Sequence, residues 1–587
     1  MRKLGWALAL LCGLTGSVEA TPKAASAPDF VIGPTTDGAV LGLRENGVTK
    51  FLGIPYAKPP VGALRWMPPQ PVAKWAGVRR AYRFGPTCAQ VTTLGPFAGP
   101  PNSNEDCLYL NVFTGDMKAK RPVLVWIHGG GYFDGASNDY DPAKLVTRGK
   151  LVVVTFNYRL NLFGFMAHPA LDAEGHAFGN YGIMDMQAVL EWVKHNIAAF
   201  GGDPGNVTVG GQSAGAGAST AIVVSPASKG LIQRAIFQSG GYTPFATKAT
   251  AEDRGKKFAA AAGCNLKNGS GGDVAKCLRA LPAAKIASLA GTASATSPLV
   301  GGPLVDGAII PKQLIDAFRS GDFNQVPVMM GTTRDEGNFT NGIAQYFKPG
   351  RAALTEADFR AYLQRTYGGN AGPGGGPPAY PKDTADAVLA QYPISKAKNI
   401  TIAFGNKGEI TWDNQPITEA ELHRRAKGGL FSDAQMAWDA AHSDVQACRG
   451  QYTAAAIAPH APVYMYVFSD RTAQSYFPKM PGYQPLAYHT SDIAYLFTGY
   501  HGGPEGVRFT LTPAQAKLSD KLVDAWANFA RSGNPNASDD TPWPRWKPGD
   551  ATPAYFLQDD GWKTLQTNAQ FAAAHNCAFW NKILLYK

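Results

Sequence analysis

The chain has 587 residues, of which 45% are apolar and 17% charged, and its formal net charge is +11. Its basic residues are scattered, without a run of five or more, and no basic stretch is interleaved with aromatic residues, so nucleic-acid binding is not expected. Glycine (66) and proline (43) together stay below the share typical of low-complexity chains, and they indicate a fold with many loops.

Residues 1–20 have the pattern of a secretory signal peptide. Arg2 and Lys3 precede a short apolar run, and Val18-Glu19-Ala20 offers small residues before a cleavage point. The apolar run is too short to span a bilayer, and no later segment could do so. We therefore expect a mature chain, 21–587, that is secreted or periplasmic and has no integral membrane segment.

Six cysteines remain after Cys12 leaves with this segment, and an even number in an exported chain predicts three disulfides. None belongs to a C-x-x-C pair, so neither a metal site nor a redox site is expected. The six are Cys88, Cys107, Cys264, Cys277, Cys448 and Cys577.

The first half of the mature chain alternates strand and helix patterns. A hairpin is expected from Val40 to Thr49, and continuous apolar runs at Val123–Ile127 and Leu151–Thr155 are typical of strands buried on both faces. Helical spacing follows from Gly182 to Phe200, and Val207–Val209 is the next strand. This alternation predicts an α/β fold with a mostly parallel sheet and helices on both faces.

The second half continues the pattern with more insertions. Ile236 and Val326–Met330 supply buried strands, and Leu518–Phe529 is an amphipathic helix. Residues 350–440 are glycine-rich or polar, and we interpret them as insertions into a single domain spanning 21–587. From its position, this region could overhang the site and influence substrate choice.

Ser213 lies in Gly211-x-Ser213-x-Gly215 directly after an apolar strand, which is the pattern of a nucleophile elbow. Such a turn holds the serine in a strained backbone conformation, and glycines remove Cβ atoms that would clash across it. By itself the pattern is weak, because glycine and serine are common in turns.

Two further motifs strengthen the interpretation. His128 and three glycines follow the strand ending at Ile127, so backbone N–H groups of Gly130 and Gly131, with that of Ala214, can form an oxyanion hole. After the strand ending at Met330, an acid stands at a carboxyl strand end, where open α/β sheets build their sites. Here Asp335 competes directly with Glu336.

The base must follow the acid if the order is nucleophile, acid, base. His489 is the preferred candidate and His501 the second, while His575 also follows the acid. Three further histidines fall inside insertions or helical stretches: His423, His442 and His460.

At this point the chain resembles the type-B carboxylesterases, a family of α/β-hydrolases that includes para-nitrobenzyl esterases and cholinesterases. The resemblance covers nearly the whole mature chain. Its motifs are Phe200–Gly215, Glu105–Asn111, Asn157-Tyr158-Arg159, Gln238-Ser239-Gly240, Trp526–Ala530 and Phe579-Trp580-Asn581.

The resemblance implies that Ser213 is the nucleophile, Glu336 the acid and His489 the base of an ester hydrolase acting through an acyl-enzyme on a small-molecule ester, without a cofactor. It implies the disulfides Cys88–Cys107, Cys264–Cys277 and Cys448–Cys577. It also suggests a second layer of polar residues at Gln212, Ser239 and Asp492.

Two departures from the family pattern bear on the substrate. Gln212 stands where many relatives carry glutamate, and the loop between Cys88 and Cys107 has no tryptophan to bind quaternary ammonium. Phe97 is a weak substitute, so we expect small to medium esters other than choline esters. An inactive adhesion or scaffold relative, or an amidase or lactonase using the same site, remains the alternative, and the oligomeric state stays open.

Overall fold

The computed structural model describes residues 28–584 except 92, 98, 242, 266–270, 292–298, 300, 369–379, 382, 395–409, 413–414, 418–431, 498–508, 537–541, 550–552 and 559–563. The expected signal peptide therefore lies outside the described residues, as do His423, His501 and much of the 350–440 region.

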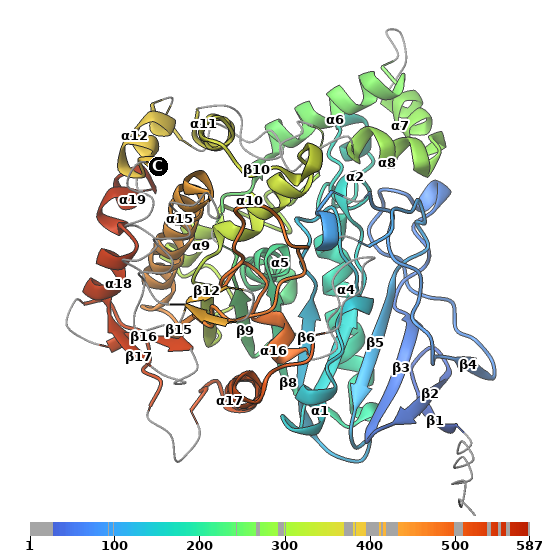
Figure 1. Ribbon diagram of the computed structural model, residues 1–587. Helices are drawn as coiled ribbons and strands as arrows, with labels where there is room; N and C mark the ends of the chain where they lie inside the picture. The colour runs from blue at the N-terminus through green and yellow to red at the C-terminus, as the bar shows by residue number, and fades with distance from the viewer. Residues whose placement is uncertain are drawn as a thin grey trace, which may run out of the picture.

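A 13-stranded sheet crosses the molecule, and its middle is parallel (Figure 1). The parallel strands lie in the order β7, β6, β8, β9, β12, β15 and β16. Their bounds are β6 Arg121–Ile127, β7 Val152–Phe156, β8 Gly202–Gln212, β9 Arg234–Gln238, β12 Val328–Thr333, β15 Val463–Phe468 and β16 Pro553–Gln558.

Antiparallel strands complete both edges of the sheet, where the short strand β4 also pairs with β2 in the parallel direction. The expected hairpin is present, because β2 pairs with β3 through Leu43 opposite Lys50. The edge strands are β1 Asp29–Pro34, β2 Ala39–Glu45, β3 Val48–Pro55, β4 Val78–Arg80, β5 Tyr109–Thr114 and, at the far edge, β17 Thr564–Thr567.

Alternate residues of β6 enter two different cores, which confirms that this strand is buried on both faces. Val123 and Val125 pack in one cluster with side chains of α4 and α5. Leu124 and Trp126 pack in the other with side chains of α17. The helices over the two faces are α4 Tyr181–Asn196, α5 Ala214–Val224, α9 Leu314–Ser320 and α15 Asp433–Ile457, against α1 Ala143–Thr147, α16 Ile493–Leu496 and α17 Pro513–Ser532.

Two helical groups stand above the carboxyl ends of the parallel strands (Figure 1). One group shares an aromatic core with α15, and it contains the helices that the structure describes within residues 350–440. Its members are α10 Gly337–Tyr346, α11 Glu356–Tyr367, α12 Thr384–Gln391 and α19 Cys577–Leu584, with the ribbon β13 Ile410–Trp412 and β14 Gln415–Ile417 nearby in the chain. The helix α18 Asn568–Ala574 lies beside β16 and β17 at the edge of the sheet. The other group comprises α2 Asn161–Gly164, α3 Pro169–Asp172, α6 Lys248–Ala262, α7 Gly271–Ala280 and α8 Ala283–Gly291, with the ribbon β10 Ala246–Thr247 and β11 Leu304–Val305.

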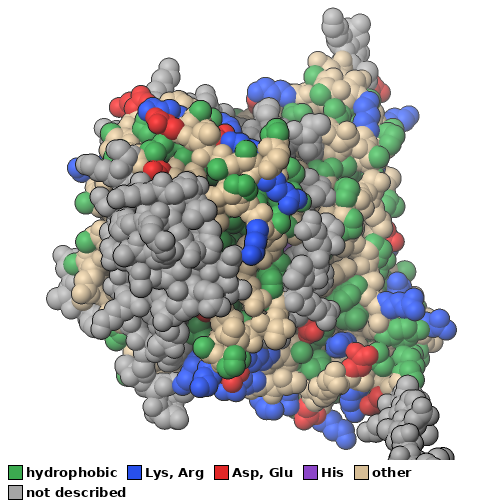
Figure 2. Space-filling model, viewed as in Figure 1, with side chains coloured by type: hydrophobic (Ala, Val, Ile, Leu, Met, Phe, Trp, Pro, Cys, Tyr) green, Lys and Arg blue, Asp and Glu red, His purple; other side chains and the backbone are tan. Residues whose placement is uncertain are grey.

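Surface charges are intermixed rather than gathered by sign along the lower edge of the molecule (Figure 2). There Lys144 of α1 and Arg148, which caps the C-terminus of α1, pair with Asp520 of α17 at 2.7 and 3.1 Å, and Arg148 also contacts Asp524 at 2.7 Å. Such exposed pairs contribute little to stability, because water screens both charges. We interpret the positive net charge as that of a solvated surface. No described helix is both long enough and apolar enough to cross a membrane.

The six described cysteines form three disulfides, in the pairs that the family resemblance implies. Cys88–Cys107 and Cys264–Cys277 close short segments, with separations of 19 and 13 residues. Cys448–Cys577 joins α15 to α19 across 129 residues. This third bond ties the C-terminal helix to the core that supports the upper helical layer.

Removing the long-range disulfide should destabilise the protein more than removing a short-range one. Loop-closure entropy predicts a cost of about 5 kcal/mol for Cys448→Ala with Cys577→Ala, against about 3 kcal/mol for Cys264→Ala with Cys277→Ala. Urea unfolding of both double variants under oxidising conditions measures the difference. An equal or reversed order would contradict this account.

Candidate active site

Ser213 sits at a sharp turn between β8 and α5, in a conformation that side chains rarely adopt. Its φ is 60° and its ψ is −123°, and its C=O accepts the Gly217 N–H at 3.1 Å as α5 begins. The Ser213 N–H in turn donates to the Gln238 carbonyl at 2.8 Å. Strained backbone of this kind persists where the surroundings impose it, and here β9 and α5 hold both sides.

Only glycine fits at the positions two residues before and two residues after Ser213. A Cβ on Gly211 would lie 2.5 Å from the Ile127 carbonyl oxygen, and one on Gly215 only 2.1 Å from the same atom. Because these contacts are to backbone, they cannot be relieved by a side-chain rotation. The first turn of α5 therefore approaches the end of β6 as closely as backbone allows.

The glycine loop after β6 is equally constrained. Gly130 and Gly131 have φ values of 109° and 62°, and a Cβ on Gly130 would lie 2.0 Å from the Asp134 carbonyl oxygen. The Tyr158 hydroxyl donates to the His128 carbonyl at 3.1 Å, and the two rings stack at 4.4 Å. Gly129, Gly130 and Gly131 thus line the cavity around Ser213, and Ala214 lies at the same wall.

Glu336 and His489 form a close pair. The His489 Nδ1 lies 2.5 Å from Glu336 Oε2, and the Thr333 N–H donates to Oε1 at 2.8 Å. Burial raises the pKa of Glu336, but the charge and hydrogen bond of His489 outweigh it, so the net pKa lies below its ordinary value. Glu336 is therefore a buried carboxylate that orients the imidazole.

Asp335, the other candidate for the acid, contacts different residues. Its carboxylate accepts two hydrogen bonds from Arg471, at 2.6 and 3.0 Å, and a third from the Ala487 N–H at 3.0 Å. Asp335 and Tyr488 also pair as an isolated bridge. Asp335 thus joins the loop after β12 to the segment that carries His489.

The other described histidines are placed elsewhere. His575 lies 3.1 Å from Asp444 under α19, and His460 lies 3.3 Å from the Arg319 carbonyl. His442 does line the cavity, and its Nδ1 lies 2.9 Å from the Tyr362 hydroxyl. Burial lowers the pKa of His442 to about 4, so it is neutral at physiological pH.

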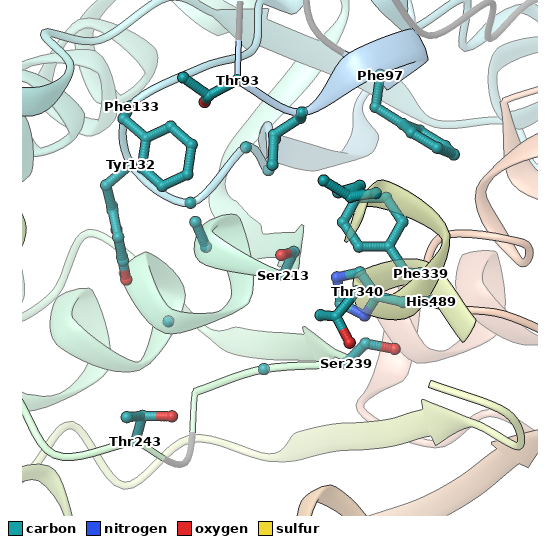
Figure 3. Close-up of a pocket in the computed structure, with 18 of the residues that line it drawn as sticks. Thr93, Phe97, Tyr132, Phe133, Ser213, Ser239, Thr243, Phe339, Thr340 and His489 are labelled. Carbon is teal, nitrogen blue, oxygen red and sulfur yellow. The ribbon is translucent and has the colours of Figure 1, made fainter. Parts of the chain in front are cut away.

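Gln212 contacts the second nitrogen of the candidate base. Its Nε2 lies 3.0 Å from His489 Nε2. With Nδ1 protonated toward Glu336, Nε2 is an acceptor, and the amide N–H donates to it. Figure 3 shows Ser213 and His489 next to each other on the wall of the cavity.

The expected second layer differs in part from what the structure contains. Gln238, which the sequence reading passed over, donates to Asp492 at 2.8 Å and accepts from Trp526 at 2.8 Å. Gln212 turns to His489 instead, and Ser239 helps to lower the pKa of Glu336. The three residues Gln212, Ser239 and Asp492 thus have different partners, which are His489, Glu336 and Gln238 respectively.

Comparison with known proteins agrees with this arrangement. The model of the Carboxylesterase family matches residues 31–580. The chain belongs to the carboxylesterase family. It is a carboxylic-ester hydrolase with the α/β-hydrolase fold.

Several characterised relatives align over most of the esterase. Fumonisin B1 esterase of Sphingopyxis macrogoltabida is 33% identical, with 90% of this chain and 87% of the relative covered. Para-nitrobenzyl esterase of Bacillus subtilis (strain 168) is 33% identical, with 87% and 91% covered. A solved PNB esterase structure superposes with a TM-score of 0.67 at 29% identity, covering 93% of this chain and 99% of that one.

The cavity of the esterase has a volume of about 1010 Å³ and reaches from the glycine loop to the upper helical layer. Phe97 and Phe339 stack edge to face at 4.7 Å on one side, and Phe339 lies 5.1 Å from the His489 ring. Leu354, Asp358 and Tyr362 on the α11 side belong to the 350–440 region, so that region does form part of the wall. Among the described residues, no group of three or more His, Cys, Asp or Glu side chains is placed to hold a metal ion.

A glycine of the turn at Ser213 and a glycine of the cavity wall should respond differently to the same substitution. Gly215→Ala places a methyl group against the Ile127 carbonyl, which distorts the turn and should lower kcat/KM by at least roughly 100-fold. Gly302→Ala is the matched control, since a Cβ there meets nothing within 4 Å. Ester hydrolysis and melting temperature of both variants provide the measurement, and an active Gly215→Ala protein would refute the packing argument.

Proposed function

We propose that the protein is an exported serine esterase in which Ser213 is the nucleophile, His489 the general base and Glu336 the acid that orients it. The observation that carries this proposal is the position of His489. One ring nitrogen faces the buried carboxylate of Glu336, and the other faces the turn that displays Ser213.

The reaction follows from these positions. The Ser213 hydroxyl replaces the Gln212 amide at His489 Nε2, gives its proton to that nitrogen, and attacks the ester carbonyl carbon. Glu336 stabilises the imidazolium that forms. The imidazolium then protonates the leaving alcohol, and a water molecule hydrolyses the acyl-enzyme by the same route in reverse.

The negative charge that develops on the carbonyl oxygen is stabilised by hydrogen bonds from the N–H groups of Gly130, Gly131 and Ala214. The positive φ values of both glycines turn the loop toward the cavity, and Ala214 opens α5, whose first N–H groups lack partners within the helix. One such donor is worth about 3–4 kcal/mol of transition-state stabilisation. No cofactor takes part in this mechanism.

The wall of the cavity favours small to medium esters other than choline esters. Gln212 brings no negative charge beside Ser213, and Phe97 packs against Phe339 and Phe477. Without a carboxylate at position 212 and without a tryptophan in the segment between Cys88 and Cys107, a quaternary ammonium group gains less stabilisation beside Ser213.

Export is supported by two independent features. Residues 1–20 have the pattern of a signal peptide, and the three disulfides are of the kind that persists in oxidising compartments.

The proposed nucleophile is tested by Ser213→Ala. Hydrolysis of short-chain p-nitrophenyl esters should fall by at least about 10³-fold, because the covalent route is lost while binding and the oxyanion donors remain. An unchanged circular dichroism spectrum shows that the fold is retained. Activity near that of the unmodified protein would sink the assignment, and failure of the unmodified protein on every ester would favour an inactive scaffold relative.

The two adjacent acids should separate into a catalytic and a structural role. Glu336→Gln should lower kcat by about 10³- to 10⁴-fold with little change in melting temperature, because the imidazole loses its anionic partner. Asp335→Asn should instead lower the free energy of unfolding by about 3–5 kcal/mol, because the buried Arg471 loses its counter-charge. The reverse pattern would make Asp335 the catalytic acid.

A further inference from the structure

The glycine loop after β6 closes on itself in one tight turn. The N–H groups of Phe133 and Asp134 both donate to the Gly130 carbonyl, at 3.0 and 2.9 Å. A Cβ on Gly135 would lie 2.4 Å from the Gly129 carbonyl oxygen, so the two ends of the turn are in backbone contact. The orientation of the N–H groups in this turn therefore depends on where Asp134 and Gly135 are held.

Gln90 binds the far end of this turn through both polar atoms of its side-chain amide. The Gly135 N–H donates to Gln90 Oε1 at 3.0 Å, and Gln90 Nε2 donates to the Gly135 carbonyl at 3.1 Å. One side chain thus satisfies the backbone donor and the backbone acceptor of a single residue, as a neighbouring strand would. Gln90 is only 4% exposed, so water competes little for either hydrogen bond.

Asp134 makes a second connection to the same part of the chain. Its Oδ2 accepts the Thr93 N–H at 3.2 Å and the Thr93 hydroxyl at 2.7 Å. Figure 3 shows Thr93 next to Phe133, the residue that precedes Asp134. A buried carboxyl group needs donors of this kind, so the two hydrogen bonds from Thr93 fix the place of Asp134.

The segment that carries Gln90 and Thr93 is itself anchored. The Gln90 N–H and carbonyl pair with the carbonyl and N–H of Asn102, each at 3.0 Å. The Asn102 side chain donates to the Cys88 carbonyl at 3.2 Å, and the disulfide from Cys88 to Cys107 closes the segment. The glycine loop is therefore attached to a part of the chain that is already fixed at both ends.

We propose that Gln90 and Asp134 are positioning residues for ester hydrolysis, which align the N–H groups of Gly130 and Gly131 before the substrate binds. This inference rests on the proposed function, because it takes those N–H groups as the oxyanion donors. Donors that are aligned in advance need no reorganisation when charge develops on the carbonyl oxygen, and a displacement of about 1 Å costs much of their effect. Gln90 and Asp134 act through the backbone of the loop, at Gly135 and at Asp134 itself.

The first test removes the hydrogen bonds and keeps the volume of the side chain. Gln90→Met should lower kcat for short-chain p-nitrophenyl esters by roughly 10- to 100-fold and change KM by less than about threefold, because the donors act mainly in the transition state. Asp134→Ala should lower kcat in the same way. Asp134→Asn should keep most of the activity, since its amide oxygen still accepts from Thr93.

Gln313→Met is the matched control. The Gln313 side chain makes the same pair of hydrogen bonds with one backbone residue, accepting the Phe245 N–H at 3.0 Å and donating to the Phe245 carbonyl at 2.8 Å. Phe245 belongs to another part of the cavity wall. Both variants should lose a similar amount of melting temperature, but Gln313→Met should keep kcat within about threefold. Equal losses of kcat in the two variants, or an unchanged kcat in Gln90→Met, would overturn the inference.

An inhibitor that resembles the transition state gives a second measurement. An alkyl trifluoromethyl ketone adds to a nucleophilic serine and forms a tetrahedral adduct whose oxygen carries the negative charge. Its inhibition constant should rise in Gln90→Met by about the same factor as kcat/KM falls, and it should stay unchanged in Gln313→Met. An unchanged constant in Gln90→Met would contradict a role in aligning the oxyanion donors.

Hydrogen–deuterium exchange separates this inference from the proposed function, because it needs no turnover. Backbone amides of residues 129–135 should exchange faster in Gln90→Met than in the unmodified protein, and at an unchanged rate in Gln313→Met. If the unmodified protein hydrolyses no ester, the proposed function fails, and the exchange rates still decide whether Gln90 holds the loop. Unchanged exchange in Gln90→Met would refute the inference even in an active esterase.

Discussion

The close approach of α5 to the end of β6 is the constraint on which the candidate site depends. Gly211 and Gly215 both lie against the Ile127 carbonyl, which leaves no room for a Cβ on either. The glycine loop begins at the next residue, so the same contact sets the distance between Ser213 and Gly130 and Gly131. The proposed nucleophile and oxyanion donors are thus positioned by one backbone contact between neighbouring parallel strands.

The proposed base, His489, is positioned by a second constraint, the buried ion pair of Asp335 with Arg471. Asp335 also accepts the Ala487 N–H, so it fastens the segment before His489 to the loop before Glu336. A buried pair of this kind adds little net stability, since its Coulomb energy mainly offsets desolvation, but it defines one arrangement of the two loops. Glu336 is then the acid that contacts His489, because the carboxylate of its neighbour Asp335 is already bound by Arg471 and the Ala487 N–H.

The sequence predicts the parts of this arrangement that depend on local pattern. Apolar runs such as Val123–Ile127 mark the parallel strands, and glycine at fixed offsets marks both tight loops. It could not decide between Asp335 and Glu336, because that choice depends on Arg471, 136 residues away. Nor could it show that Gln238 rather than Ser239 contacts Asp492, since that contact depends on the register of β9 with β8 and β12 and on a residue 254 positions away.

The burial of Arg254 could have been predicted from its position in the sequence, but its surroundings could not. Counted along α6, it falls three residues after Ala251 and four before Phe258, which places it on the buried stripe by helical spacing alone. In the folded protein Arg254 is 2% exposed and lines the cavity that contains Ser213. Helical spacing therefore shows that this side chain is buried, but the groups that surround it belong to other elements and follow only from the tertiary structure.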